Sequence, residues 1–183
     1  MHSEKELVEQ CRKNKKKAQE KLYRLYAPKM YGVCMRYANS QFEADDILQE
    51  GFIKVFLHLK DFRSDGSLEG WIRRTIINTA INFYRKNLKH QNEISIDDYE
   101  TGNPNYETVI DKLSAEELLE VIRELPDGYR MIFNLNVIEG YTHKEIGAKL
   151  KISENTSKSQ LSRARQVLQG KLQNLLNFQY SEK

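Results

Sequence analysis

The chain has 183 residues, of which 39% are hydrophobic and 30% are charged, a composition typical of globular proteins rather than of chains that stay disordered throughout. Its 29 basic and 26 acidic side chains give a net charge of +3, which by itself indicates no particular partner. The amino terminus lacks an apolar signal segment and no apolar run approaches membrane-spanning length, so we expect a cytoplasmic protein without membrane insertion.

Helical periodicity runs through the first half of the chain, and strand signals are nearly absent. Apolar residues three and four apart follow residues 22–37, interrupted at Pro28, where we expect one helix to end and another to begin. A second pattern covers residues 42–59, with an acidic opposite face, and a third covers residues 72–83 after the polar segment 62–70. These patterns predict one helical domain over residues 1–87.

The charges near the middle of the chain are segregated by sign. Between Glu69 and Glu93 the Asp, Glu, Lys and Arg residues are all basic, whereas those from Glu93 to Asp111 are all acidic. The acidic stretch is rich in turn-forming residues and has little periodicity, so we interpret residues 88–112 as a flexible acidic linker. The basic stretch is typical of a surface that contacts nucleic acid.

The second half predicts another helical domain, over residues 113–183, that contains two helices joined by a tight turn. Thr142 and Glu145 have the spacing of a capping box at the start of the first of these helices. Lys151 and Ile152 form the turn, and Ser153 is placed to cap a second helix over residues 154–176.

The second of these helices carries an apolar stripe and a polar face rich in hydrogen-bond donors. Ser157, Leu161, Ala164 and Leu168 share the stripe, and the opposite face is formed by Asn155, Lys158, Ser159, Ser162, Arg163 and Gln166. This pattern is typical of a helix-turn-helix whose second helix enters the major groove of DNA. An exposed helical hairpin with ordinary surface charges is the alternative interpretation.

Two long motifs resemble the extracytoplasmic-function (ECF) sigma factors of the bacterial sigma-70 family. The segment ELPDGYRMIFNLNVIEGYTHKEIGAKLKISENTSKSQLSRARQVL resembles their region 4. The segments EADDILQEGFIKVFLHLKDF and GWIRRTIINTAINFYRK resemble region 2. The resemblance implies an all-α fold of two small helical domains and an RNA polymerase sigma factor, without enzymatic activity or a cofactor.

In region 4 the resemblance implies contacts to the minus-35 promoter element. The matching base-contacting positions are Lys158, Ser159, Ser162 and Arg163, and the expected phosphate contacts are Asn155, Thr156 and Arg165. Two positions depart from the family pattern. Lys151 replaces the usual glycine or asparagine of the turn, which a lysine tolerates if its φ angle is negative, and Ser157 replaces an aliphatic residue.

In region 2 the resemblance implies two surfaces. One opens the minus-10 element and captures a flipped base, with Phe62, Asn78 and Asn82 matching the family's pocket region. For Trp71, a role as a core anchor is the open alternative. The full sets are Phe62, Arg63, Trp71, Arg73, Arg74, Asn78, Asn82 and Arg85 for minus-10 DNA, and Asp45, Asp46, Gln49, Glu50 and Phe52 for the polymerase.

The implied partners are core RNA polymerase, promoter DNA in double- and single-stranded form, and an anti-sigma factor. We expect the chain to contact core polymerase at the clamp coiled coil of the largest subunit and at the flap of the second largest subunit. For Asp97, Asp98 and Glu100 in the linker, mimicry of nucleic acid and a plain soluble tether both remain open. Cys11 and Cys34 match no zinc-binding spacing, so we expect buried free thiols and no metal.

Three other function classes compete with this interpretation. A helix-turn-helix regulator without polymerase has no need for the single-strand surface around Trp71. An enzyme is disfavoured because the four histidines are scattered and no nucleophile is paired with a base. A polymerase-bound regulator that does not contact promoters has no use for the polar face at residues 155–166.

Overall fold

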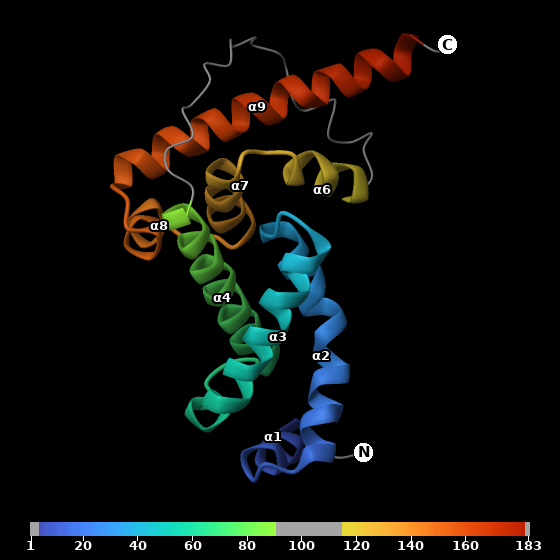
Figure 1. The fold of residues 1–183 in the computed structure, drawn as a ribbon, viewed down its shortest axis with the longest axis vertical. Helices are drawn as coiled ribbons and strands as arrows, with labels where there is room; N and C mark the ends of the chain where they lie inside the picture. Colours follow the sequence, from blue (N-terminus) through green and yellow to red (C-terminus); the bar gives the residue numbers. More distant parts are fainter. Residues whose placement is uncertain (1–3, 91–114, 182–183) are drawn as a thin grey trace. The chain divides into compact units, whose positions relative to one another are not determined.

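The computed structural model describes residues 4–90 and 115–181, and within these ranges every regular element is a helix (Figure 1). The chain divides into two compact units, Met1–Lys86 and Asn87–Lys183. The predicted all-α fold with two small helical domains is confirmed. Most of the predicted linker, with Asp97, Asp98 and Glu100, lies outside the described residues.

In its described residues, the first unit contains four α-helices and one short 3₁₀ helix. Ser40 caps the helix Gln41–His58 by accepting a hydrogen bond from the Glu43 N–H at 3.1 Å. The core of the first unit is built from fully buried aliphatic side chains such as Leu22, Ile47 and Ile76. The elements are α1 (Glu4–Arg12), α2 (Lys16–Tyr37), α3 (Gln41–His58), η1 (Leu59–Asp61) and α4 (Leu68–His90).

Helix α2 runs unbroken through Pro28, so the helix boundary predicted there is wrong. Proline removes one hydrogen bond from the helical ladder and crowds the preceding turn. Pro28 is exposed, whereas Tyr26, Met30 and Val33 are buried along the same helix. Burial of this continuous stripe offsets the cost of one proline, which local sequence signals do not register.

Within its described residues, the second unit packs shorter helices against one long helix. Its core joins the helices Ala115–Arg123 and Asp127–Phe133 to the helix Glu154–Ser181 through Val121, Leu125, Tyr129 and Ala164. No helix in the described parts of the chain is long and apolar enough to cross a membrane. The elements are α6 (Ala115–Arg123), α7 (Asp127–Phe133), the π-helical η2 (Asn134–Ile138), α8 (His143–Leu150) and α9 (Glu154–Ser181).

A buried arginine closes the turn between α6 and α7. Arg130 is only 4% exposed. Its Nη1 donates to the carbonyl oxygens of Arg123 and Leu125 at 2.9 and 3.2 Å, and its Nη2 lies 3.0 Å from Asp127 Oδ1. These bonds satisfy the buried guanidinium and fix the turn before α7, the helix that packs against α9.

Candidate nucleic-acid interfaces

The helix-turn-helix begins at the capping box predicted from sequence. Thr142 accepts a hydrogen bond from the Glu145 N–H at 3.3 Å, and the Glu145 carboxylate accepts one from the Thr142 N–H at 2.8 Å. The bond from the Thr142 N–H, together with the Thr142 hydroxyl that donates to the same carboxylate at 2.8 Å, holds the pKa of Glu145 below its ordinary value. Ser153 accepts a hydrogen bond from the Thr156 N–H at 2.9 Å, so the predicted cap of α9 is also confirmed.

The turn between α8 and α9 places a lysine in the left-handed region. Lys151 has φ 60° and ψ 42°, so the condition for an easily tolerated lysine at this position, a negative φ, is not met. Its N–H and that of Ile152 both donate to the Gly147 carbonyl oxygen. This closure of the α8 carboxyl end requires a left-handed residue, and lysine adopts that conformation at an energetic cost.

Gly147 allows the second helix to approach the first, which the sequence analysis missed. A Cβ atom at this position would lie 2.8 Å from the Ile152 carbonyl oxygen, closer than a carbon and an oxygen can pack. The close approach sets the start of α9 relative to α8. A glycine four residues before the turn is the available sequence signal.

The polar face predicted on α9 is exposed as expected. Lys158 forms an ion pair with Glu154 at 2.7 Å, and its hydrogen bond lowers the pKa of Glu154. The Thr156 hydroxyl bonds to Ser153 within the helix cap, so this half-buried side chain has less freedom to reach phosphates than expected. The exposed residues are Asn155, Lys158, Ser159, Ser162, Arg163, Arg165 and Gln166.

Ser157 is completely buried at the contact between α8 and α9. Its hydroxyl lies 2.9 Å from Nδ1 of His143, at the start of α8. A hydrogen bond between side chains therefore joins the two helices where the family pattern has aliphatic packing. The sequence analysis did not predict this hydrogen bond, although a serine at a buried stripe position was the signal for a polar partner.

Helix α8 adds cations that sequence reasoning did not assign to DNA. Lys144 and Lys151 are exposed, and the Lys149 ammonium lies 4.9 Å from the centre of the Tyr141 ring. In a helix-turn-helix the first helix crosses the DNA backbone. The lysines of α8 and of the turn after it therefore add positive charge to the helix-turn-helix.

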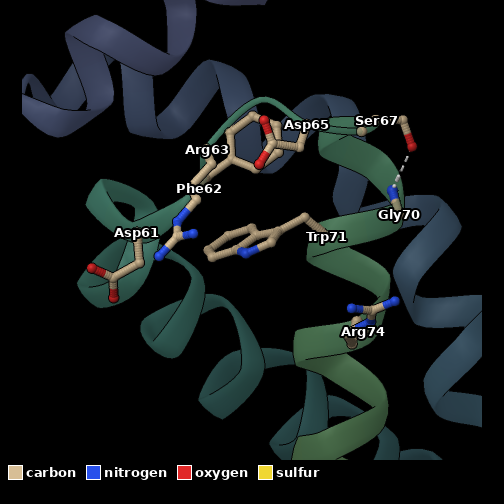
Figure 2. A pocket seen from close by; sticks show the side chains of 9 residues that line it. Asp61, Phe62, Arg63, Asp65, Ser67, Gly70, Trp71 and Arg74 are labelled. Carbon is tan, nitrogen blue, oxygen red and sulfur yellow. Dashed lines mark hydrogen bonds between the residues drawn. The ribbon is translucent and has the colours of Figure 1, made fainter.

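The first unit contains a pocket of about 440 Å³ between the loop that follows η1 and the start of α4 (Figure 2). The rings of Phe62 and Trp71 lie 5.7 Å apart at an angle of 50°. Trp71 is half-buried, so it forms a wall of the pocket rather than a sealed core anchor. The pocket is lined by Asp61, Phe62, Arg63, Asp65, Gly66, Ser67, Gly70, Trp71 and Arg74.

The pocket combines aromatic rings with charges of both signs. Figure 2 shows the Trp71 ring projecting from α4 toward the loop that carries Arg63. Ser67 accepts a hydrogen bond from the Gly70 N–H at 3.0 Å, which ties the loop to the first turn of α4. Aromatic surfaces stack on bases and arginines contact phosphates, so this arrangement suits an unpaired nucleotide.

The remaining residues expected at the minus-10 element lie outside the pocket lining. Asn78 and Asn82 are exposed farther along α4, on the helical face that begins at Trp71. Arg73 and Arg85 are half-buried. The structure therefore brings Phe62, Arg63, Trp71 and Arg74 together and leaves the two asparagines on an adjoining surface.

Helix α3 presents an exposed face that is both acidic and apolar. Asp45, Asp46 and Gln49 are exposed, and Glu50 is half-buried in an ion pair with Lys54 at 2.6 Å. Phe42, Ile53 and Leu57 on the same face are 77%, 59% and 64% exposed, and the sequence analysis missed them. Three large apolar side chains on one exposed helical face are the signal for a protein contact.

Phe52 does not belong to this face. It is 2% exposed and packs edge-on against Tyr23, with their ring centres 4.7 Å apart. Its predicted contact with a partner is therefore inconsistent with this structure. The same residue also fitted the apolar stripe of the 42–59 pattern, and that interpretation is correct.

The two cysteines are buried free thiols, as predicted. Burial raises the pKa of Cys34 to about 12 and also raises the pKa of Cys11. In the described part of the chain, no group of three or more histidine, cysteine or acidic side chains is arranged to hold a metal ion.

Two family models match the chain: Sigma-70 region 2 over residues 22–89 and Sigma-70, region 4 over residues 115–168. The ECF RNA polymerase sigma factor SigE of Mycolicibacterium smegmatis is 31% identical to this chain over 153 residues. The aligned segment covers 81% of this chain and 59% of that protein. The ECF RNA polymerase sigma-E factor of Escherichia coli K12 is 29% identical, covering 93% of this chain and 94% of that protein.

A solved structure has a similar fold. The sigma factor RpoE from Bartonella quintana, in a co-crystal with the anti-sigma factor NepR, has a TM-score of 0.50 and 19% identity, covering 85% of this chain and 96% of that chain. Both family models, in this order, together with the ECF relatives, establish that the chain belongs to the ECF sigma factors of the sigma-70 family. It is an RNA polymerase sigma factor and not an enzyme.

Proposed function

We propose that this sigma factor divides promoter recognition between its two helical domains, in the cytoplasm. Residues 1–87 act as region 2, which binds core polymerase and holds the opened minus-10 strand. Residues 113–183 act as region 4, which contacts duplex DNA at the minus-35 element and the flap of the polymerase. Residues 88–112 connect them.

The pocket lined by Phe62 and Trp71 is the observation that carries this proposal. A protein that binds only duplex DNA has no need for two tilted rings, 5.7 Å apart, beside exposed arginines. Extruding a base costs a few kcal/mol, which stacking and hydrogen bonds must return. Arg74 at the pocket and the exposed Asn78 and Asn82 beyond it supply the polar contacts that follow the strand away from the captured base.

The polymerase contact is proposed for the exposed face of α3. Asp45 and Asp46 supply charge that pairs with basic residues of the clamp coiled coil. Phe42, Ile53 and Leu57 supply apolar area, and their exposure supports a surface that is covered in the complex. Phe52 packs on the buried side of α3, against Tyr23, and does not contact the partner.

An anti-sigma factor is a further proposed partner. The B. quintana neighbour was crystallised with one, and the apolar side chains exposed on α3 here form a surface that such a regulator can cover. Because polymerase would use the same face, we expect the two partners to compete. Competition between the two partners is measured with the unsubstituted chain and with Asp46→Arg as a variant of this face. Simultaneous binding of both partners to this face would contradict the proposal.

Substitutions on α9 test the proposed contacts at the minus-35 element. Lys158→Ala and Arg163→Ala are each expected to weaken binding at individual base pairs by about 1 to 3 kcal/mol. Arg165→Ala is the matched control, because a phosphate contact weakens binding to all sequences alike. Equal losses on every promoter variant for Lys158→Ala would instead make Lys158 a phosphate contact.

Asn78→Ala tests strand capture separately from polymerase binding. The exposed Asn78 does not belong to the α3 face, so holoenzyme assembly is expected to be unchanged. Promoter opening, followed by permanganate reactivity of unpaired thymines, is expected to fall. A footprint identical to that of the unsubstituted protein would refute the assignment of Asn78.

A further inference from the structure

The loop that forms one wall of the pocket is held by an arginine from a distant helix. Arg12, the last residue of α1, donates from Nε to the Leu59 carbonyl oxygen at 3.3 Å and from Nη2 to the Phe62 carbonyl oxygen. Its Nη1 lies 2.6 Å from the Glu9 carboxylate, an ion pair within α1. The side chain of Arg12 is 27% exposed, so these bonds are partly shielded from water.

The two carbonyl acceptors belong to Leu59, the first residue of η1, and to Phe62, the residue that follows η1. The Phe62 N–H donates to Leu59 O at 3.3 Å, so the backbone turns back on itself at this point. Arg12 satisfies the carbonyl groups at both ends of the turn with one planar guanidinium. A charged donor fixed by two acceptors holds this backbone more tightly than neutral hydrogen bonds would.

The Phe62 ring depends directly on this backbone position. It is 7% exposed and faces Trp71 in the pocket, whereas Arg12 does not line the pocket. A shift of the Phe62 backbone moves the Phe62 ring and the Trp71 ring that packs against it, which changes the aromatic wall of the pocket on which a base would stack. Arg12 thus acts on the pocket through Phe62 rather than by contact with DNA.

We propose that Arg12 is a positioning residue that sets the base selectivity of the pocket by fixing the backbone at Phe62. The proposal rests on the proposed capture of a single-stranded base. Arginine suits the task because its donors form a rigid fork, whereas a lysine ammonium is a single point of charge. The chain's amino-terminal helix thereby takes part in strand capture without touching the strand.

The test measures base preference rather than affinity alone. Holoenzyme assembled from the full chain and its core polymerase is titrated with labelled single-stranded oligonucleotides. These carry the non-template strand of a promoter that the holoenzyme opens, with each minus-10 position in turn set to each of the four bases. The unsubstituted protein is expected to show one position with a strong preference.

Arg12→Gln is expected to reduce that preference about fivefold to tenfold, the size of one ordinary intramolecular hydrogen bond, because Arg12 acts on the base only through Phe62. Arg12→Lys, which can reach one carbonyl at a time, is expected to give an intermediate loss. Glu9→Gln is the matched control, because it removes the ion pair and keeps both carbonyl contacts. Its preference is expected to equal that of the unsubstituted protein.

The outcomes separate positioning from simple stabilisation. If Arg12→Gln weakens binding of all four bases equally, Arg12 is only structural and the proposal is overturned. Should this variant fail to fold, as judged by helical circular dichroism, the base preference of Arg12→Lys decides the question in the same way. An unsubstituted holoenzyme with no base preference at any position would instead contradict the proposed strand capture itself.

Discussion

Gly147→Ala places one methyl group where the two helices of the helix-turn-helix approach most closely. The added Cβ would lie 2.8 Å from the Ile152 carbonyl oxygen, 3.6 Å from the Glu154 nitrogen and 3.7 Å from the Ser153 carbonyl carbon. All three neighbours are backbone atoms, so no side chain can rotate away. Relief requires a shift of the turn that weakens the Ile152 N–H bond to Gly147 O, now 3.1 Å long.

The expected cost is about 1 to 3 kcal/mol, the range for inserting a carbon into a packed site. For a domain of this size each kcal/mol lowers the melting temperature by about 4 to 8 °C. Gly170→Ala on α9 is the matched control, because its Cβ meets no atom within 4 Å. Alanine there is expected to stabilise the helix by about 0.5 to 1 kcal/mol.

The single tryptophan, Trp71, allows the first unit to be followed separately. Helical circular dichroism reports both units, whereas tryptophan fluorescence reports only the first. Gly147→Ala is expected to lower the unfolding transition seen by circular dichroism and to leave the fluorescence transition in place. An unchanged or raised circular dichroism transition would refute the close packing at Gly147.

Three further predictions concern residues that depart from simple sequence rules. Lys151→Gly should stabilise the second unit by about 0.5 to 1 kcal/mol, since it removes a left-handed lysine at some cost in chain entropy; urea denaturation that shows a loss would contradict the φ of 60°. Ser157→Ala and His143→Ala, combined in a double-mutant cycle, should show a coupling of about 0.5 to 1.5 kcal/mol, and additive losses would exclude their hydrogen bond. Cys11 and Cys34 should resist thiol reagents at pH 8 until the protein is unfolded, because burial raises both pKa values; rapid labelling of the folded chain would disprove that burial.

Local sequence patterns were sufficient to predict the helix caps. Thr142 with Glu145, and Ser153 before α9, have short-range spacings whose hydrogen bonds form wherever the following helix forms. The polar and apolar faces of α9 also followed from periodicity, because a helix this long fixes the direction of each side chain. These features required no knowledge of the tertiary structure.

Features that depend on distant contacts were missed or misjudged. Pro28 stays within α2 because a buried stripe holds the helix on both sides of it. Phe52 matched both an apolar stripe and a partner contact, and only its packing on Tyr23 separates them. Arg12 reaches acceptors 47 and 50 residues away, and no sequence spacing indicates such a pair.

A promoter-opening assay tests whether this chain melts promoter DNA together with core polymerase. A fluorescent base analogue in the minus-10 region of a promoter is measured with the chain alone, with core polymerase alone and with both together. We expect an increase in fluorescence only when both are present, and its loss when Trp71 is replaced by alanine. Tight binding of the chain alone to duplex promoter DNA, with no opening when polymerase is added, would contradict it.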